Sequence, residues 1–194
     1  MMDVMMAHIP GLRYQLGYLD PTAQAQLLQT IDAQPWLADL KRRVQHYGYR
    51  YDYTRRTVAH DLALGPLPNW AATLALRLHA EGYTPAVPDQ VIINEYLPGQ
   101  GIASHVDCLP CFGDTILSLS LGSPCIMVFT ERKTTRQVEV LLAPGSLLVM
   151  HGAARYDWLH GIPQRKSDVC AGQRILRARR VSLTFRTVRH PGTT

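Results

Sequence analysis

One stretch of the chain decides how the rest is interpreted: Ile93-Asn-Glu-Tyr-Leu-Pro-Gly-Gln-Gly-Ile-Ala-Ser-His-Val-Asp107. It is predicted to form two short strands around a turn at Pro98-Gly99, because proline and glycine favour turns. Residues two apart on a strand point to the same face. We therefore expect Asn94 and Tyr96 to share one face of the first strand, and His105 and Asp107 to share one face of the second.

The chain after Pro88 consists of short β runs separated by proline and glycine. Breaks such as Gly122-Ser-Pro124 and Pro144-Gly145 are typical of turns. The predicted strands are Gln90–Tyr96, Ile102–Asp107, Thr115–Leu121, Cys125–Thr130, Gln137–Leu142, Ser146–His151, Arg155–His160 and Arg179–Val188. Closely spaced strands without helices between them favour a sandwich or jelly roll over a βαβ sheet.

Residues 1–89 carry helical patterns instead. Asp20 is a good N-cap for a helix at Pro21–Asp32, and a second helix is predicted at Pro68–Glu81. The run Tyr47–Tyr53 is a strand or hairpin candidate. The predicted fold class is mostly β with flanking helices. We expect a single domain of residues 1–194, in which a double-stranded β-helix (jelly roll) at 90–188 leans on an N-terminal α/β scaffold at 1–89.

The composition excludes a disordered chain, because 46% of the 194 residues are hydrophobic. No run approaches the roughly 18 consecutive apolar residues that a membrane span needs, and residues 1–7 lack the pattern of a secretory signal. We therefore expect a cytoplasmic monomer with no membrane partner. The net charge of +5 rests on 17 arginines and three lysines. This balance permits a nucleic-acid partner, although a genome that prefers arginine codons explains it equally well.

His105 and Asp107 form a candidate metal pair. A histidine and a carboxylate on one face, joined by a distant second histidine, make a 2-His-1-carboxylate triad, which leaves positions open on the metal and suits non-haem Fe(II). Taken alone, an H-x-D pair is more often a solvated strand end than a metal site. The hypothesis that His105 and Asp107 bind a metal ion therefore needs support from further residues.

The predicted C-terminal strand has two distinct faces. Arg180, Ser182, Thr184 and Arg186 share one face, while Val181, Leu183 and Phe185 share the other. Two arginines on one side of an apolar strand are costly to bury unless an anion meets them. A dicarboxylate is a natural counterpart, because guanidinium binds carboxylate through two charge-assisted hydrogen bonds. The alternative is an amphipathic edge strand with solvated arginines.

Four motifs together resemble the AlkB-type Fe(II)/2-oxoglutarate-dependent dioxygenases. The stretch that ends at Asp107 resembles the N-x-Y-x-x-G-x-x-I-x-x-H-x-D signature of that family. The other three are Leu117-Ser-Leu-Ser-Leu-Gly122, Ala154-Arg-Tyr-Asp-Trp-Leu-His-Gly-Ile162 and Arg180-Val-Ser-Leu-Thr-Phe-Arg186. They cover residues 90–188 in the family order. The resemblance implies a jelly-roll enzyme that uses Fe(II), 2-oxoglutarate and O₂, with a substrate lid in residues 1–89.

The resemblance also assigns roles to single residues. It implies that His105, Asp107 and His160 bind the iron, with His151 as a competing candidate for the third ligand. It implies that 2-oxoglutarate is held by Asn94, Tyr96, Arg180 and Arg186. In this assignment Arg186 pairs with the far carboxylate, and Arg180 lies on the Asp107 side of the site. Ser182 replaces an asparagine found in some members.

The implied reaction is oxidative dealkylation of alkylated nucleobases in DNA or RNA, that is, nucleic-acid repair. Two alternatives stay open: hydroxylation of a wobble base in tRNA, and hydroxylation or demethylation of a protein side chain. Leu109 stands where AlkB has a base-contacting aspartate, so the sequence does not fix the lesion, the strandedness or the kind of polymer. The motifs around Tyr51, His160 and Ser182 look more like the AlkB homologue that hydroxylates tRNA.

The tyrosine-rich run supplies the candidate substrate residues. Its four tyrosines are expected to face one side of a strand, with Arg55 and Arg56 nearby, where they could stack on a base. Packing on the barrel is the competing explanation. Within the run we select Tyr51, followed by Arg50 and Asp52.

The four cysteines are expected to be free thiols, since nothing in the sequence indicates an oxidising compartment. Cys108 and Cys111 directly follow the H-x-D pair and could form half of a zinc site. Cys125 and Cys170 are isolated, so the second half of such a site is missing.

Overall fold

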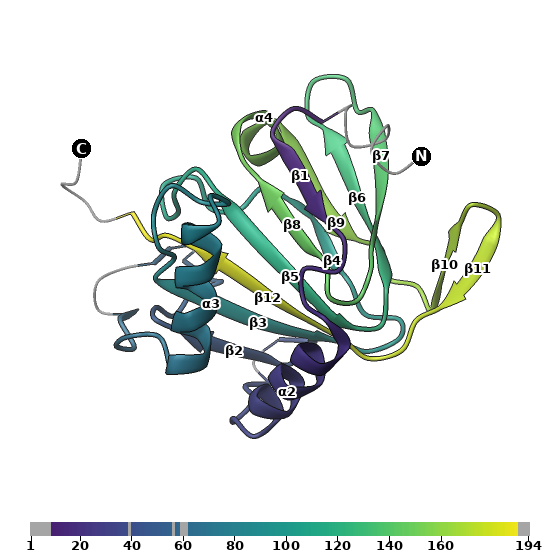
Figure 1. Ribbon diagram of the computed structural model, residues 1–194. Helices are drawn as coiled ribbons and strands as arrows, with labels where there is room; N and C mark the ends of the chain where they lie inside the picture. The colour runs from purple at the N-terminus through teal and green to yellow at the C-terminus, as the bar shows by residue number, and fades with distance from the viewer. Residues whose placement is uncertain (1–8, 39, 56, 59–61, 190–194) are drawn as a thin grey trace.

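Two antiparallel sheets form the body of the protein in a computed structural model, which describes residues 9–38, 40–55, 57–58 and 62–189 (Figure 1). Residues 1–7 and Arg56, which entered the sequence analysis, lie outside this part. The six-stranded sheet has the order β1 (Leu12–Gln15), β8 (Leu147–Met150), β5 (Ile116–Gly122), β12 (Arg180–Arg186), β3 (Gln90–Tyr96), β2 (Val44–Tyr47). The four-stranded sheet has the order β4 (Ile102–His105), β9 (Trp158–Ile162), β6 (Cys125–Glu131), β7 (Gln137–Leu142). The predicted fold class, a mostly β jelly roll with flanking helices, is confirmed.

Two helices, α2 (Pro21–Asp32) and α3 (Asn69–Ala80), cover the outer face of the six-stranded sheet (Figure 1). The predicted first helix is confirmed, and the Asp20 carboxylate caps it by accepting from the backbone N–H of Ala23 at 2.8 Å. Apolar side chains of both helices share one core cluster with the sheet. Among the described residues, no helix has the length and apolarity needed to cross a membrane.

Strand alternation sends polar and apolar side chains to opposite faces of β12. Val181, Leu183 and Phe185 pack in the cluster beneath the helices, whereas the side chains at even positions from 180 to 186 line a cavity between the sheets. β3 pairs with β12 in register, with Asn94 opposite Ser182. The period of two therefore places both polar faces on one cavity, as the sequence predicts.

The predicted strand Arg155–His160 is wrong in its first half. Residues Gly152–Tyr156 form a short helix, α4, and the strand β9 begins at Trp158. The helix places the guanidinium of Arg155 in the interior, where it donates to the backbone oxygens of Asp107 at 2.9 Å and Cys108 at 3.2 Å. These tertiary contacts outweigh the local β pattern.

Strand β1 and the hairpin of β10 (Ser167–Cys170) and β11 (Gln173–Leu176) were not predicted. The hairpin projects from the body of the protein (Figure 1). Its base is held by the buried carboxylate of Asp168, which accepts from Arg165 and Arg177 and from the backbone N–H of Ile126. Arg165 and Arg177 are near Asp168 in the sequence, whereas Ile126 is 42 residues away, so only the tie to the four-stranded sheet leaves no sign in the local pattern.

The four tyrosines of the tyrosine-rich run do not share one face, contrary to the prediction. Tyr47 belongs to β2 and packs against Trp70 of α3 on the outer side, whereas Tyr51 and Tyr53 line the cavity. Gly48 separates the two groups with φ of +77°, and a Cβ there would lie 1.8 Å from the backbone oxygen of Asp89. This glycine breaks the alternation of a strand and turns the chain toward the cavity.

Two of the four cysteines are not free thiols, which corrects the expectation. Cys108 and Cys111 form a disulfide directly after Asp107, and only Cys125 and Cys170 are free. Sulfur atoms bonded to one another are not thiolate ligands, so the alternative of half a zinc site at Cys108 and Cys111 has no support in this structure.

Candidate active site

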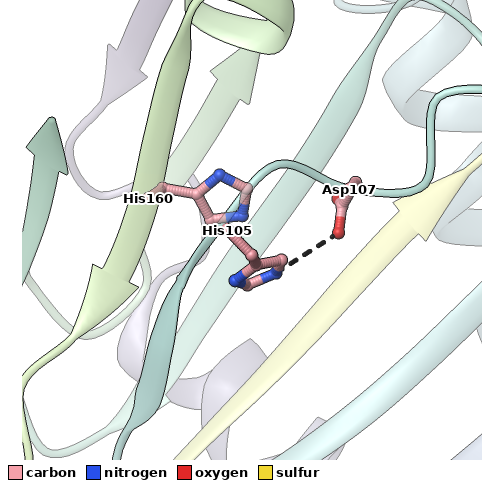
Figure 2. Close-up of side chains that lie close together, drawn as sticks. All are labelled: His105, Asp107 and His160. Atoms are coloured by element: carbon pink, nitrogen blue, oxygen red, sulfur yellow. Dashed lines mark ion pairs between the residues drawn. The ribbon is translucent and has the colours of Figure 1, made fainter. Parts of the chain in front are cut away.

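His105, Asp107 and His160 converge on one point between the two sheets. Their potential ligand atoms all lie within 4.8 Å of one another, and Figure 2 shows the three side chains pointing toward a common centre. β4 ends at His105, two residues earlier than predicted, so Asp107 lies in the loop that follows. Pairing of His105 with His160 across β4 and β9 brings the second histidine into place.

The contacts of these three groups prepare them to bind a cation. The ring Nδ1 of His105 lies 2.8 Å from the backbone oxygen of Ala103, so Nδ1–H donates there and Nε2 is left facing Asp107 at 3.6 Å. Burial lowers the pKa of His160 to about 4, which keeps this imidazole neutral near pH 7. Two imidazoles and one carboxylate are the donor set that suits Fe(II).

The Asp107 carboxylate is held as an anion. Burial raises its pKa, but Arg186 and the two histidines outweigh that effect and keep the pKa well below its usual range. Arg186 donates from Nε and Nη2 to the two carboxylate oxygens at 3.2 Å each. Arg155 holds the backbone oxygen of the same residue. Two arginines from distant segments therefore fix the position of Asp107.

The two arginines of β12 are placed opposite to their predicted order. Arg186, expected to meet a far carboxylate, contacts Asp107, whereas Arg180 lies at the other end of the cavity-facing strand. That order was carried over from the family resemblance, and strand alternation could not test it, because alternation assigns a face but not the point that a long side chain reaches.

Arg180 lacks the partners that a buried guanidinium requires. The residue is 2% exposed, and its one side-chain hydrogen bond to a described residue runs from Nη2 to Ser120 Oγ at 2.9 Å. Its Nε and Nη1 atoms have no hydrogen-bond partner within the described part of the chain. A buried polar group left unsatisfied costs about 1–3 kcal/mol. A carboxylate at this end of the cavity would satisfy both atoms, so the residues present fit a dicarboxylate such as 2-oxoglutarate.

A cavity of about 330 Å³ connects the two ends of the site. All of the predicted metal and 2-oxoglutarate residues line it, together with Tyr51. The other two substrate candidates do not. Arg50 is exposed, and Asp52 accepts from the backbone N–H groups of Thr54 and Arg55 in a turn.

The sequence analysis missed four residues of the site. Arg42 and Tyr53 line the cavity from the N-terminal part, Phe112 lines it beside Arg186, and Arg155 supports Asp107. Tyr53 belongs to the tyrosine-rich run and could have been chosen. Arg42 has no signal in its local sequence, since it lies among other charged residues just before a strand.

Comparison with known proteins agrees with the family resemblance of the sequence motifs. The sequence model of the 2OG-Fe(II) oxygenase superfamily matches residues 11–186. An Arabidopsis thaliana protein named "Alkylated DNA repair protein ALKBH8 homolog" is 38% identical over 208 residues, which cover 95% of this chain and 60% of that protein. A Xenopus tropicalis protein named "tRNA (carboxymethyluridine(34)-5-O)-methyltransferase alkbh8" is 38% identical, over 93% of this chain and 32% of that protein. The chain thus spans less than two thirds of either relative.

Solved structures share the architecture. The structure of OsALKBH1 superposes with a TM-score of 0.67 over 92% of this chain and 97% of that chain. Its sequence is only 19% identical, so the likeness concerns the fold alone.

Proposed function

This chain belongs to the AlkB-type oxygenases of the 2OG-Fe(II) oxygenase superfamily, and from that premise we propose that it hydroxylates a carbon substituent of a base in tRNA. It is an oxidoreductase that depends on Fe(II), 2-oxoglutarate and O₂. We further infer that residues 1–194 form one domain, with helices and a substrate lid in residues 1–89 and the catalytic jelly roll in residues 90–188. β1 and β2 support this organisation, because they pair with core strands of the six-stranded sheet.

We assign the metal to His105, Asp107 and His160, and the co-substrate to Asn94, Tyr96, Arg180 and Arg186. When Fe(II) and 2-oxoglutarate are bound, one oxygen atom of O₂ enters the substrate C–H bond and the other enters succinate, with loss of CO₂. The protein positions these partners. Arg180 binds the far carboxylate, and Arg186 keeps Asp107 ionised and oriented.

The observation that carries the substrate proposal is a pair of tyrosines in the cavity wall, Tyr51 and Tyr53, which we call the lid. Tyr51 and Tyr53 line the cavity and contact each other edge to face with ring centroids 5.0 Å apart. Tyr51 also lies 5.9 Å from Phe112, which is next to Arg186. Aromatic rings beside a reactive centre suit a base taken out of its stack. The relatives named for uridine in tRNA favour RNA among the possible polymers.

The test measures succinate release and product mass with three separate substrate pools: tRNA, DNA and protein extract. We expect bulk tRNA to stimulate succinate release by the iron-loaded protein, and nucleoside mass spectrometry to show a modified uridine that gains one oxygen. Stimulation by protein extract alone, or by no nucleic acid at all, would overturn the proposal.

Oxidative dealkylation of damaged bases is the second candidate, because the Arabidopsis relative is named for repair of alkylated DNA. Its product differs in a measurable way. A methylated or etheno-modified oligonucleotide would return to the plain base with loss of the added carbon as an aldehyde. Restored bases without any oxygenated uridine would favour this candidate over the first.

Tyr51→Ala is expected to raise the KM for RNA roughly 5- to 100-fold, because stacking of a base on an aromatic ring contributes about 1–3 kcal/mol. The 2-oxoglutarate requirement should change much less. Tyr51→Phe keeps the ring and serves as the matched control, with a KM near that of the wild type. Equal KM values for the alanine variant and the wild type would contradict stacking on Tyr51.

A further inference from the structure

Arg42 occupies an unusual position for an arginine. It precedes β2, is partly buried, and lines the same cavity as the candidate metal residues. Its Nε donates to Oδ1 of Asn94 at 2.8 Å, and its guanidinium carbon lies 5.8 Å from the centre of the Tyr96 ring. Arg180 lies 5.5 Å from the same ring. Two guanidinium groups therefore flank Tyr96 at the end of the cavity to which we assign 2-oxoglutarate.

The neighbouring Arg43 shows how different Arg42 is. Arg43 points to the opposite side and forms two hydrogen bonds with the Glu95 carboxylate, at 2.6 and 2.7 Å. Within the described part of the chain, Arg42 has no carboxylate within ion-pair distance. No acidic side chain in that part of the chain therefore neutralises its positive charge, although it lines the cavity that contains the candidate metal residues.

Arg42 and Tyr53 of the lid line the same cavity. Burial raises the pKa of Tyr53, and the nearby guanidinium of Arg42 acts against that rise. Tyr53 in turn contacts Tyr51. One guanidinium thus joins the tyrosine pair of the lid to Asn94 on β3.

The contact with Asn94 also determines which groups that amide presents. Its Oδ1 accepts from Arg42, so the Nδ2 hydrogens remain as donors. Donors at this place complement a carboxylate, as do the unpaired atoms of Arg180. Asn94 and Arg180 both then present donors at the co-substrate end of the cavity, and Arg42 orients the amide of Asn94.

We propose that Arg42 is a positioning residue that couples the lid to co-substrate binding, so that 2-oxoglutarate orders Tyr51 and Tyr53 for the substrate base. This inference rests on the 2-oxoglutarate site of the proposed function. Binding of the diacid stabilises the Asn94 amide in its donating orientation, which strengthens the bond to Arg42 and through it the contact with Tyr53. By reciprocity, an ordered lid tightens binding of the diacid.

The test uses hydrogen exchange on the whole 194-residue chain loaded with Mn(II), which should occupy the candidate metal site without supporting turnover. In the wild type we expect saturating 2-oxoglutarate to slow exchange of lid amides about 5-fold or more, in line with typical coupling. The reporters are the backbone N–H groups of Arg50 and Asp52, which donate to Leu62 and Thr57. In Arg42→Met, this protection should disappear and the Kd for 2-oxoglutarate should rise.

Three further variants keep the test decisive. Arg43→Met is the matched control, since it removes an adjacent arginine that faces away from the cavity, and its lid should respond as in the wild type. Tyr53→Phe cuts the link at the lid but keeps the bond of Arg42 to Asn94, so it should lose protection while its Kd for 2-oxoglutarate rises only by the reciprocal coupling factor and less than in Arg42→Met. Arg42→Lys keeps the charge but not the fork of donors, so it should restore affinity for the diacid more than protection of the lid.

The outcomes separate the two proposals. If calorimetry shows no binding of 2-oxoglutarate to the wild-type protein, the assigned co-substrate site is wrong and the coupling falls with it. If the wild type binds the diacid but the lid amides exchange at unchanged rates, the site stands and the coupling is wrong. Protection that persists in both Arg42→Met and Tyr53→Phe would also overturn the coupling.

Discussion

His105→Ala is expected to abolish 2-oxoglutarate-dependent oxidation while the protein remains folded. Loss of groups that merely support a metal ligand already reduces activity or metal affinity about 10- to 100-fold, so loss of a ligand itself should cost at least about 100-fold. The His105 side chain is 28% exposed, and its removal leaves no buried charge unpaired. Turnover, Mn(II) affinity by calorimetry and the thermal midpoint should be measured together.

His105 is a better probe than Asp107 for a structural reason. Removing the Asp107 carboxylate leaves Arg186 buried without its partner, and breaking a buried ion pair in this way costs about 3–5 kcal/mol. Lost activity in an Asp107 variant would then mix chemistry with unfolding. His151→Ala is the matched control, because His151 is exposed and lies outside the triad. Wild-type turnover in His105→Ala would refute the metal assignment.

Arg180→Met is expected to weaken binding of 2-oxoglutarate about 10- to 100-fold, because a charge-assisted hydrogen bond contributes about 1.5–3 kcal/mol. The free protein should keep its stability or gain some, since the substitution removes two buried donors that have no partner in the described structure. This combination distinguishes a ligand-binding arginine from a structural one. Calorimetric titration with 2-oxoglutarate and a denaturant midpoint would measure both effects.

Arg186→Met provides the contrast. Arg186 pairs with Asp107, so its loss should lower the free energy of unfolding and weaken metal binding. If Arg186→Met lost affinity for 2-oxoglutarate selectively while Arg180→Met did not, the order of the two arginines expected from the sequence would be restored.

Local sequence periodicity was enough to predict which side chains of β3 and β12 face the cavity. The alternation of Arg180 to Arg186 and of Asn94 and Tyr96 depends only on the local period of two residues, and the cavity is lined accordingly. The H-x-D pair was found in the same way, whereas His160 was chosen over His151 from the family resemblance. These features are local, or are carried by motifs with a fixed order.

The contacts made by the ends of long side chains could be identified only from the three-dimensional structure. The reach of Arg180 and Arg186 depends on partners from other strands, and the bond of Arg42 to Asn94 joins residues 52 positions apart. The disulfide of Cys108 with Cys111 and the helix at Arg155 likewise formed against the local expectation. Backbone alternation repeats along the sequence, whereas an arginine fork finds its partner through packing in three dimensions, and that packing is not encoded in any short stretch of the chain.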